Sequence, residues 1–194
     1  MTQANTDRIK AETRKEAAAS RLDASKANPD AAEKLARFAE HLIAEFHPQN
    51  IAGYWPIKSE LDVFPLVSAL AMSQKVKLCL PITGAPETAL SFHRWQLGDT
   101  LDIGPYDTRQ PFPEKAELVP DLMLLPLLAF DEKLNRLGYG GGFYDRTLAS
   151  FAHTGNTVMA IGIAYESQKI DKVPIGYFDR PLDGVLTPSG LIMG

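Results

Sequence analysis

Short apolar segments, most of them without alternation between hydrophobic and polar residues, constrain the fold of this chain more than any other feature. Such strands are usually buried on both faces, as in parallel sheets that helices cover on both sides. We therefore predict an α/β fold with a mainly parallel sheet flanked by helices. The expected strands are residues 51–54, 76–80 (ended by Pro81), 89–95, 122–128, 157–164 and 184–187.

Helices are predicted at the N-terminus and between these strands. Residues 7–27 are rich in Ala, Lys, Arg and Glu and lack Gly and Pro, a composition that favours a helical segment. Asp30 is expected to cap a second helix, because apolar residues recur at three- and four-residue spacing from Leu35 to Phe46. Further helices are expected over residues 62–73 and 144–152.

The length and overall composition indicate one globular domain, residues 1–194. Hydrophobic residues make up 45% and charged residues 23%, and the net charge of −4 gives no reason to expect a nucleic acid partner. No apolar run approaches the ~20 residues of a membrane span. Cys79 is the only cysteine, so an internal disulfide is impossible, and a soluble cytoplasmic monomer is expected.

Residues 98–120 form a long segment with four prolines, at positions 105, 111, 113 and 120. Long loops inside compact domains are uncommon and often cover ligands. This segment is therefore a candidate for closing over a binding site.

The stretch Arg136-Leu-Gly-Tyr-Gly-Gly-Gly-Phe-Tyr-Asp-Arg146 carries the clearest functional signal. Its four glycines let the backbone expose N–H groups to an anion, and the helix expected from Tyr144 would direct its positive end to the same place. Asp145 in the first turn would repel a phosphate unless a divalent cation lay between them. The combination indicates a nucleoside triphosphate carried with Mg²⁺.

Two familiar phosphate-binding patterns are absent. The chain contains no Gly-x-x-x-x-Gly-Lys-Ser/Thr stretch, and Phe143 stands where the dinucleotide pattern needs glycine. The alternative is a tight turn without a ligand, since glycine-rich turns are common.

Cations on the first helix could contact the same anion. Lys10 and Arg14 lie four residues apart and hence on one face, with Arg21 two turns further along. The alternative is a solvated charged face whose charge Glu12 and Glu16 offset.

Four aspartates lie near predicted strand ends or glycine turns and could hold a metal ion: Asp131, Asp145, Asp179 and Asp183. Mg²⁺ commonly takes one or two carboxylates and completes its shell with phosphate oxygens and water. Asp145 is the best candidate because it adjoins the glycines, whereas Asp179 also fits an ordinary Asp-Arg-Pro turn.

Trp55 and Glu60 are candidates for binding an organic substrate. They follow a predicted strand, and open α/β sheets place ligands at the carboxyl ends of their strands. The indole could stack on a heterocycle, and the carboxylate could accept hydrogen bonds from ring N–H groups. Alternatively, Trp55 packs in the core and Glu60 supplies negative charge to the start of the next helix.

The chain resembles the 5-formyltetrahydrofolate cyclo-ligase (5,10-methenyltetrahydrofolate synthetase) family over almost its full length, on segments that occur in the family's order. These segments are Lys10-x-x-x-Arg14, Glu60-Leu-Asp, Gly104-Pro-Tyr, Pro126 to Asp131, Arg136 to Arg146, Gln168, and Asp179 to Asp183. The central block is long and specific. The resemblance implies a Rossmann-like α/β fold and an ATP-dependent ligase that takes reduced folate and ATP as substrates, with Mg²⁺.

The resemblance also implies a role for each matching position. Those that match ATP-binding positions are Lys10, Arg14, Arg136, Leu137, Gly138, Tyr139, Gly140, Gly141, Gly142, Phe143 and Tyr144. Among them Lys10, Arg14 and Arg136 would neutralise charge during catalysis. Asp145 and Asp179 match metal ligands. Trp55, Glu60, Tyr139, Gly140, Gly141, Gly142 and Phe143 match positions that contact the folate.

Three positions depart from the family pattern: Phe178 where His is usual, Gln110 where Glu is usual, and Phe143 where Tyr is common. The implied reaction joins 5-formyltetrahydrofolate and ATP to give 5,10-methenyltetrahydrofolate, ADP and phosphate. Two alternatives remain, namely another ATP-dependent ligase or kinase on the same fold, and a folate- or nucleotide-binding regulator without catalysis.

Overall fold

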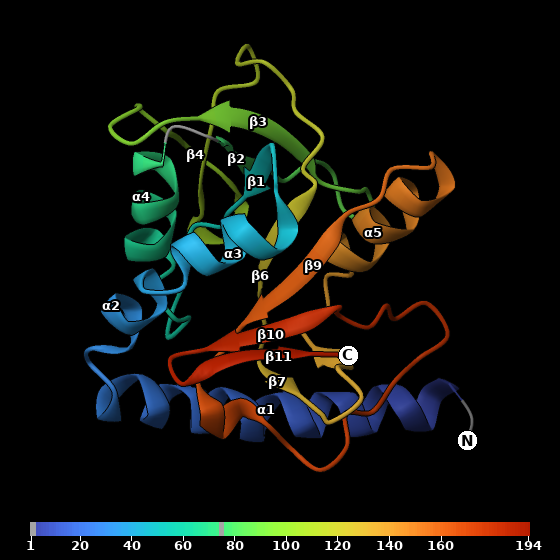
Figure 1. Ribbon diagram of the computed structural model, residues 1–194. Coiled ribbons are helices and arrows are strands. Elements are labelled where there is room, and N and C mark those ends of the chain that lie inside the picture. The colour runs from blue at the N-terminus through green and yellow to red at the C-terminus, as the bar shows by residue number, and fades with distance from the viewer. Residues whose placement is uncertain (1–2, 74–75) are drawn as a thin grey trace.

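A seven-stranded sheet forms the centre of the protein in the computed structural model, which describes residues 3–73 and 76–194 (Figure 1). The strands lie in the order β11-β10-β9-β6-β1-β2-β3. Their bounds are β1 Asn50–Ala52, β2 Lys77–Ile82, β3 Ser91–Trp95, β6 Leu122–Pro126, β9 Met159–Ile163, β10 Gly184–Thr187 and β11 Gly190–Met193. All six expected strands are present in this sheet.

The sheet is mainly parallel, as predicted. The five inner strands pair in parallel, whereas the two edge strands, β3 and β11, run antiparallel to their neighbours. The sequence prediction did not include β11, which follows β10 after a short turn and pairs Val185 with Ile192.

Helices cover both faces of the sheet. Their bounds are α1 Gln3–Ala27, α2 Ala31–Ala36, α3 Ala39–Phe46, α4 Phe64–Met72 and α5 Phe143–His153. On one face α2, α3 and α4 pack against residues such as Ile51 and Leu122, and on the other face α5 packs against residues such as Met123 (Figure 1). The fold class predicted from the sequence, a sheet flanked by helices with an N-terminal helical segment, is confirmed.

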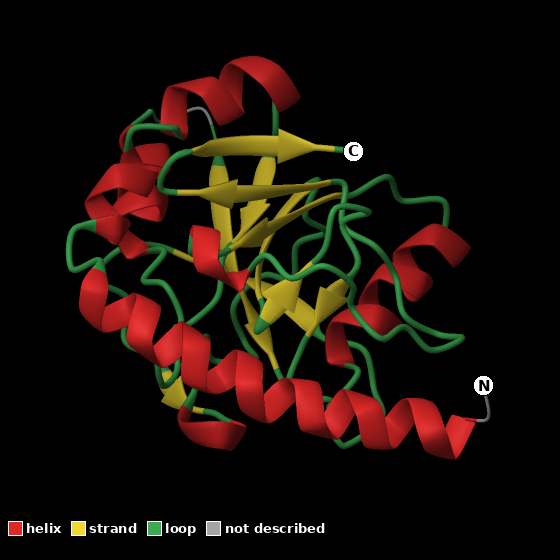
Figure 2. Cartoon of the chain, turned by 90° about the horizontal axis from the view of Figure 1, so that it is seen from below, coloured by secondary structure: helices red, strands yellow, loops and turns green. Residues whose placement is uncertain are grey.

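Helix α1 stands apart from these two layers. It is a single long helix that runs across the molecule (Figure 2). Ala17 on α1 packs against Leu128, Leu137 and Val173, which belong to segments that follow the sheet strands. The helix therefore closes the end of the sheet at which the parallel strands finish.

Three local predictions were wrong. The helix expected to continue to Phe46 breaks at Arg37 and Phe38, where the N–H groups of both residues bond to carbonyls three residues back. This tighter turn redirects the chain so that Leu35 and Leu42 are both fully buried.

Pro81 does not end its strand. β2 continues to Ile82, and Pro81 pairs in register with Phe92. The parallel neighbour β1 ends at Ala52, opposite Cys79, so beyond that point β2 has one open edge where a missing N–H is tolerated.

Asp30 precedes α2 as expected, but its carboxylate pairs with Lys34 instead of capping the helix.

The segment 98–120 contains short regular pieces, including a two-stranded hairpin. The smaller elements of the fold are β4 Asp102–Ile103, η1 Pro105–Asp107, β5 Arg109–Gln110, β7 Ala129–Phe130, β8 Arg136–Leu137 and η2 Glu166–Gln168.

Within the parts of the chain that the structure describes, every helix is too short or too polar to cross a lipid bilayer.

Candidate functional site

A cavity of about 890 Å³ opens at the carboxyl ends of the central strands. Tyr54 and Trp55 follow β1, Thr83 follows β2, and Pro126 ends β6, and all four residues line the cavity. The chain leaves β1 toward β2 on one side and later returns to β6 on the other side. Open α/β sheets bind ligands at such a switch point, so the fold itself favours this position.

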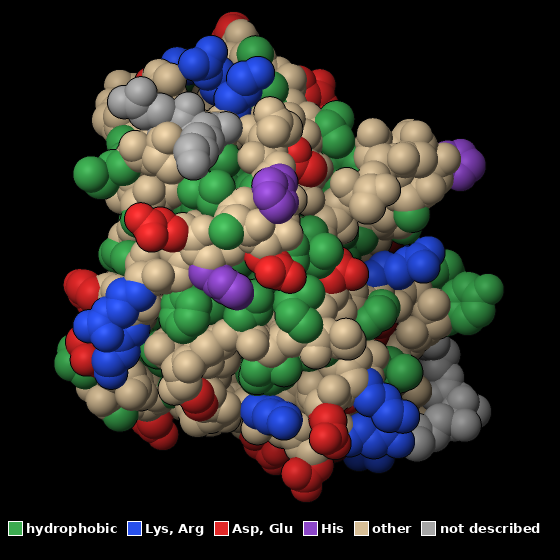
Figure 3. All heavy atoms as spheres, viewed as in Figure 1, with side chains coloured by type: hydrophobic (Ala, Val, Ile, Leu, Met, Phe, Trp, Pro, Cys, Tyr) green, Lys and Arg blue, Asp and Glu red, His purple; other side chains and the backbone are tan. Residues whose placement is uncertain are grey.

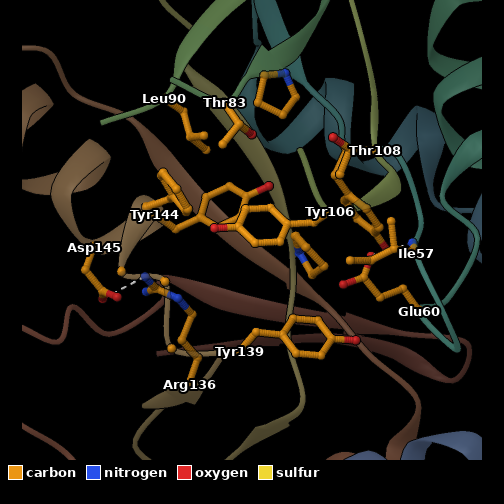
Figure 4. A pocket seen from close by; sticks show the side chains of 18 of the residues that line it. Ile57, Glu60, Thr83, Leu90, Tyr106, Thr108, Arg136, Tyr139, Tyr144 and Asp145 are labelled. Carbon is orange, nitrogen blue, oxygen red and sulfur yellow. Dashed lines mark hydrogen bonds and ion pairs between the residues drawn. The ribbon is translucent and has the colours of Figure 1, made fainter. Parts of the chain in front are cut away.

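The site residues that the family resemblance assigns all line this one cavity, although they come from four separate segments. These residues are Lys10, Arg14, Trp55, Glu60, Arg136, Leu137, Gly138, Tyr139, Gly140, Gly141, Gly142, Phe143, Tyr144, Asp145 and Asp179. Figure 4 shows Arg136 and Asp145 at one end and Glu60 with the Tyr139 hydroxyl toward the other.

A buried arginine and an aspartate form the first end of the cavity. Arg136 lies on β8, and its Nη2 atom is 2.8 Å from Asp145 Oδ1 in the first turn of α5. The same carboxylate oxygen accepts the N–H of Arg180, while Arg136 Nη1 donates to the Arg180 carbonyl at 2.5 Å. The arginine therefore has a fixed orientation, with charge-assisted bonds on two sides.

Lys10 and Asp179 extend this end of the cavity. Lys10 Nζ lies 2.5 Å from Asp179 Oδ2, which also accepts the N–H of Gly176 at 2.8 Å. Lys10 is only 9% exposed, whereas Glu12 on the same helix is exposed. The interpretation of Lys10 as part of a solvated face is therefore wrong.

The glycine loop, residues 138–142, is held by arginine side chains. Arg14 Nε donates to the carbonyl of Gly138 at 3.0 Å, and its guanidinium lies against Gly140. A Cβ atom on Gly140 would be 3.0 Å from Arg14 Cζ, and the φ of Gly140 is +99°. Glycine is needed here for both the backbone conformation and the close approach of the arginine.

The loop also offers free donors. Among the described residues, no hydrogen bond uses the N–H of Gly140 or Gly141. Gly142, with φ +67°, then leads into the N-terminus of α5. Unused amides beside a helix N-terminus and three cations are suited to bind a phosphate group.

This concentration of cations is local. On the face seen in Figure 3, Lys and Arg side chains are interspersed with Asp and Glu side chains. The chain as a whole carries a net charge of −4. A polyanion would therefore be attracted to the cavity by the local arrangement of Lys10, Arg14 and Arg136, and not by the total charge.

Glu60 marks the other end of the cavity. Its side chain is 4% exposed, Oε2 accepts the N–H of Ile57 at 2.9 Å, and Oε1 lies 3.7 Å from Arg21 Nη1. Burial raises the pKa of Glu60 to about 7, and the Ile57 bond and the charges of Arg21 and Lys58 oppose that rise. Glu60 does not lie in the first turn of the following helix, where one interpretation of the sequence had it supply negative charge, because α4 begins only at Phe64.

Two aromatic residues accompany Glu60. Trp55 is half-buried and packs edge-on against Phe64, with the ring centroids 5.0 Å apart, while it also lines the cavity. The Tyr139 hydroxyl accepts a hydrogen bond from Arg21 Nη2, and Lys58 Nζ lies 4.7 Å from the centre of the Tyr139 ring. This end can accept hydrogen bonds and stack on a planar ring.

The segment expected to cover a ligand contributes Tyr106, Asp107, Thr108 and Arg109 to the lining. Tyr106 faces Phe143 across the cavity in an edge-to-face arrangement, with the ring centroids 6.3 Å apart. The length of segment 98–120, its prolines and the Gly104-Pro-Tyr match indicated this loop in the sequence, whereas nothing there singled out Lys58.

The three departures from the family pattern have different surroundings. Phe178 is 80% exposed and packs on Tyr177. Gln110 accepts the N–H of Thr83 through its side-chain oxygen. Phe143 lines the cavity, where a tyrosine would add a hydroxyl.

The aspartates considered as metal ligands separate into two groups. Asp131 accepts N–H groups from Lys133, Asn135 and Val173 and thus organises a turn, and Asp183 accepts the N–H of Ala160. Asp145 and Asp179 face the cavity. Over residues 3–73 and 76–194, no group of three or more His, Cys, Asp or Glu residues is arranged to hold a metal ion.

Comparison with known proteins gives one consistent result. Residues 6–188 match the model of the 5-formyltetrahydrofolate cyclo-ligase family. The 5-formyltetrahydrofolate cyclo-ligase of Haemophilus influenzae is 32% identical over 162 residues, which are 80% of this chain and 84% of that protein. The enzyme of the same name from Escherichia coli (strain K12) is 34% identical over 146 residues, 72% of this chain and 78% of that protein.

Solved structures agree with these sequence relatives. The NMR structure of Aquifex aeolicus 5,10-methenyltetrahydrofolate synthetase superposes with a TM-score of 0.75 at 25% identity, and the match covers 95% of this chain and 92% of that one. A 5,10-methenyltetrahydrofolate synthetase from Mycoplasma pneumoniae has the same fold, with a TM-score of 0.70 at 24% identity over 92% of this chain and 98% of that one.

Proposed function

Since this chain belongs to the 5-formyltetrahydrofolate cyclo-ligase family, we propose that it converts 5-formyltetrahydrofolate and ATP into 5,10-methenyltetrahydrofolate, ADP and phosphate. The observation that carries the proposal is the division of one cavity into two ends. Lys10, Arg14 and Arg136 suit a triphosphate at one end, and Glu60 with Trp55 suits a heterocycle at the other.

The chemistry explains why such a reaction needs ATP. A formamide oxygen is a poor leaving group, so it must first be activated. Attack of the formyl oxygen on the γ-phosphorus forms an O–P bond, breaks the bond to ADP and leaves an imidate phosphate on N5. N10 then adds to the activated carbon and loses its proton, and phosphate departs as the methenyl bridge forms.

Lys10, Arg14 and Arg136 lie at what we call the cationic end of the cavity. They would act by positioning the substrates and by balancing charge, as in phosphoryl transfer generally. Arg136 is buried and oriented by Asp145 and Arg180, so it can hold a phosphate oxygen without reorganising. Arg14 and the free amides of the glycine loop would bind further oxygens. No side chain has to form a covalent bond to substrate.

Mg²⁺ is part of the proposal because the cavity contains suitable carboxylates. Asp145 and Asp179 each use one oxygen in an ion pair, and the other oxygen of each accepts no hydrogen bond from the described residues. Two carboxylates with phosphate oxygens and water fit the preference of Mg²⁺. When bound, the ion would reduce the negative charge of the triphosphate.

At the other end, Trp55 and Glu60 would orient the pterin ring. The carboxylate of Glu60 can accept hydrogen bonds from ring N–H groups, and the indole offers a flat apolar face. The active form of our proposal is a monomer. We place the enzyme in the reducing cytoplasm, where the buried Cys79 remains a thiol.

A spectrophotometric assay tests the proposal. The purified protein with 5-formyltetrahydrofolate, ATP and MgCl₂ should develop methenyl absorbance, and omission of ATP or of magnesium should abolish it. Absence of product with all components present contradicts the proposal. Binding of both substrates without turnover would indicate a regulator, and turnover of a different acid in a substrate panel would indicate another ligase.

A further inference from the structure

Arg21 is the most deeply buried cation in the described part of the chain, at 1% exposure, and it does not line the cavity itself. It lies behind the end of the cavity that contains Glu60 and Trp55, which we call the folate end. An arginine in such a place must have its charge and its five donors satisfied, because an unpaired buried charge is strongly destabilising. Its partners therefore show what its position accomplishes.

Arg21 connects α1 to three other segments. Nε donates to Ser59 Oγ at 3.2 Å, Nη1 donates to the Leu127 carbonyl at 3.1 Å, and Nη2 donates to the Tyr139 hydroxyl. These partners belong to the segment after β1, the segment after β6 and the glycine loop. The guanidinium thus links the segments that follow β1 and β6, the two strands of the switch point, to the glycine loop.

The nearest negative charge is Glu60, whose Oε1 lies 3.7 Å from Arg21 Nη1 and whose side chain is as buried as that of the arginine. Of the two carboxylate oxygens, Oε2 accepts the N–H of Ile57, while Oε1 accepts no hydrogen bond from the described residues. At 3.7 Å, Arg21 Nη1 is too far from Glu60 Oε1 for a direct hydrogen bond, so this oxygen remains available to a ligand.

We propose that Arg21 is a positioning residue that holds the Glu60 carboxylate as a charged acceptor facing the folate end of the cavity. This inference rests on the proposed function, because it assigns Glu60 to the reduced folate. It gives the N-terminal helix a second task besides binding phosphate. Lys10 and Arg14 serve the cationic end, and Arg21, on the same helix, serves the opposite end from behind.

The charged state of Glu60 depends on several neighbours. Arg21 on α1 and Lys58 on the same loop favour the carboxylate, as does the N–H of Ile57. Glu60 also interacts electrostatically with the hydroxyl groups of Tyr54, Tyr139 and Tyr144. Burial raises the pKa of Tyr144, so this phenol stays neutral. Removal of Arg21 leaves Lys58 as the only cation of this group.

The test compares Arg21→Met and Arg21→Lys with a matched control, Arg8→Met, which removes an exposed arginine from the same helix. Initial rates of methenyl formation are measured from pH 5.5 to 9 at varied folate and varied ATP. Arg21→Met should raise the KM for folate about tenfold or more and change the KM for ATP by less than about threefold. The control should match the wild type.

The pH profile separates this role from simple structural support. In Arg21→Met the acid limb of kcat/KM for folate should move up by about one pH unit or more, since loss of a nearby cation favours the neutral carboxyl. Arg21→Lys keeps a charge and should leave the limb within about half a unit of the wild type. A folded Arg21→Met protein whose limb does not move overturns the proposal.

A double variant covers the case in which Arg21→Met does not fold. Arg21→Met/Glu60→Gln removes both buried charges, and relative to Glu60→Gln alone it should change the KM for folate by less than about threefold. A tenfold rise in that background would show that Arg21 acts independently of Glu60 and would overturn the proposal. Wild-type protein without turnover rejects the proposed function instead, so the two failures are distinct.

Discussion

Single side chains at the cationic end should control the use of ATP. Arg136→Ala removes a buried guanidinium held by Asp145 and the Arg180 carbonyl, so a phosphate bound there would lose its most rigid partner. We expect kcat/KM for ATP to fall about a hundredfold or more. Steady-state kinetics with circular dichroism of the variant measure this.

The control for that prediction is Arg94→Ala, which removes an exposed arginine from edge strand β3. It should leave ATP kinetics unchanged. If Arg136→Ala folds and uses ATP as the wild type does, Arg136 has no part in binding the triphosphate.

Glu60 should affect the pH dependence of stability as well as ligand binding. Burial raises its pKa in the folded protein from 4.5 to about 7 although Arg21 opposes the rise, so the folded state binds this proton more tightly than the unfolded chain does. Its contribution to stability is complete below the unfolded pKa and is lost as the pH rises through about 7. Relative to Glu60→Gln, the wild type should lose up to about 3 kcal/mol of unfolding free energy between pH 4.5 and 8.

Urea denaturation of both proteins at several pH values measures this difference. Glutamine has nearly the same shape and does not titrate, which makes it the appropriate reference. A difference that stays constant across the range would mean that the pKa of Glu60 is not raised.

The sequence indicated some of these residues better than others. Arg136 and Asp145 were identified because they flank a long specific glycine motif. Arg21 appeared only as a third cation on a helix face, since its role depends on Leu127 and Tyr139, more than a hundred positions away. Spacing along one helix contains no information about such contacts.

Among the structural elements, the glycine loop should be sensitive to an added side chain at Gly140. Gly140→Ala places a Cβ atom 3.0 Å from Arg14 Cζ at a φ of +99°, so it strains the backbone and displaces the arginine. We expect a loss of about 1 kcal/mol in stability together with a rise of about tenfold in the KM for ATP.

Gly155→Ala is the matched control for this variant. Gly155 also has a positive φ, +76°, but a Cβ atom there meets nothing within 4 Å. It should reproduce the loss of stability without the change in KM. Equal kinetics for the two alanine variants would show that the contact between Arg14 and the loop is unimportant.

Element prediction succeeded where local patterns determine structure. Unalternating apolar runs located all six expected strands, and helix-favouring composition located α1. The break between α2 and α3 was missed because Arg37 and Phe38 carry no helix-breaking signal, and the turn exists to bury Leu35 and Leu42 together. Strand β2 passed through Pro81 because its open edge depends on where β1 ends, which is a property of the whole sheet.

For the molecule as a whole, ligands should stabilise the fold, because the cavity joins α1, the segment after β1, the glycine loop and residue 179. At about a hundred times its Kd, a ligand that binds only the folded state adds about 2.7 kcal/mol. For a chain of this size that raises the Tm by about 5–10 °C. Differential scanning fluorimetry with Mg-ATP and with 5-formyltetrahydrofolate measures each shift.

The rise in Tm caused by ATP should depend on magnesium, whereas the rise caused by 5-formyltetrahydrofolate should not. Asp145→Asn should reduce the magnesium-dependent part, since it removes one proposed ligand charge. A Tm unaffected by Mg-ATP at saturating concentration would contradict the assignment of the cationic end.

The contact between Lys10 and Asp179 joins residues that are 169 positions apart. Because synthesis runs from the amino to the carboxyl end, Lys10 is made long before the carboxylate that pairs with it. A polypeptide that stops before residue 179 therefore lacks the ion pair that joins α1 to the C-terminal part of the chain at this cavity.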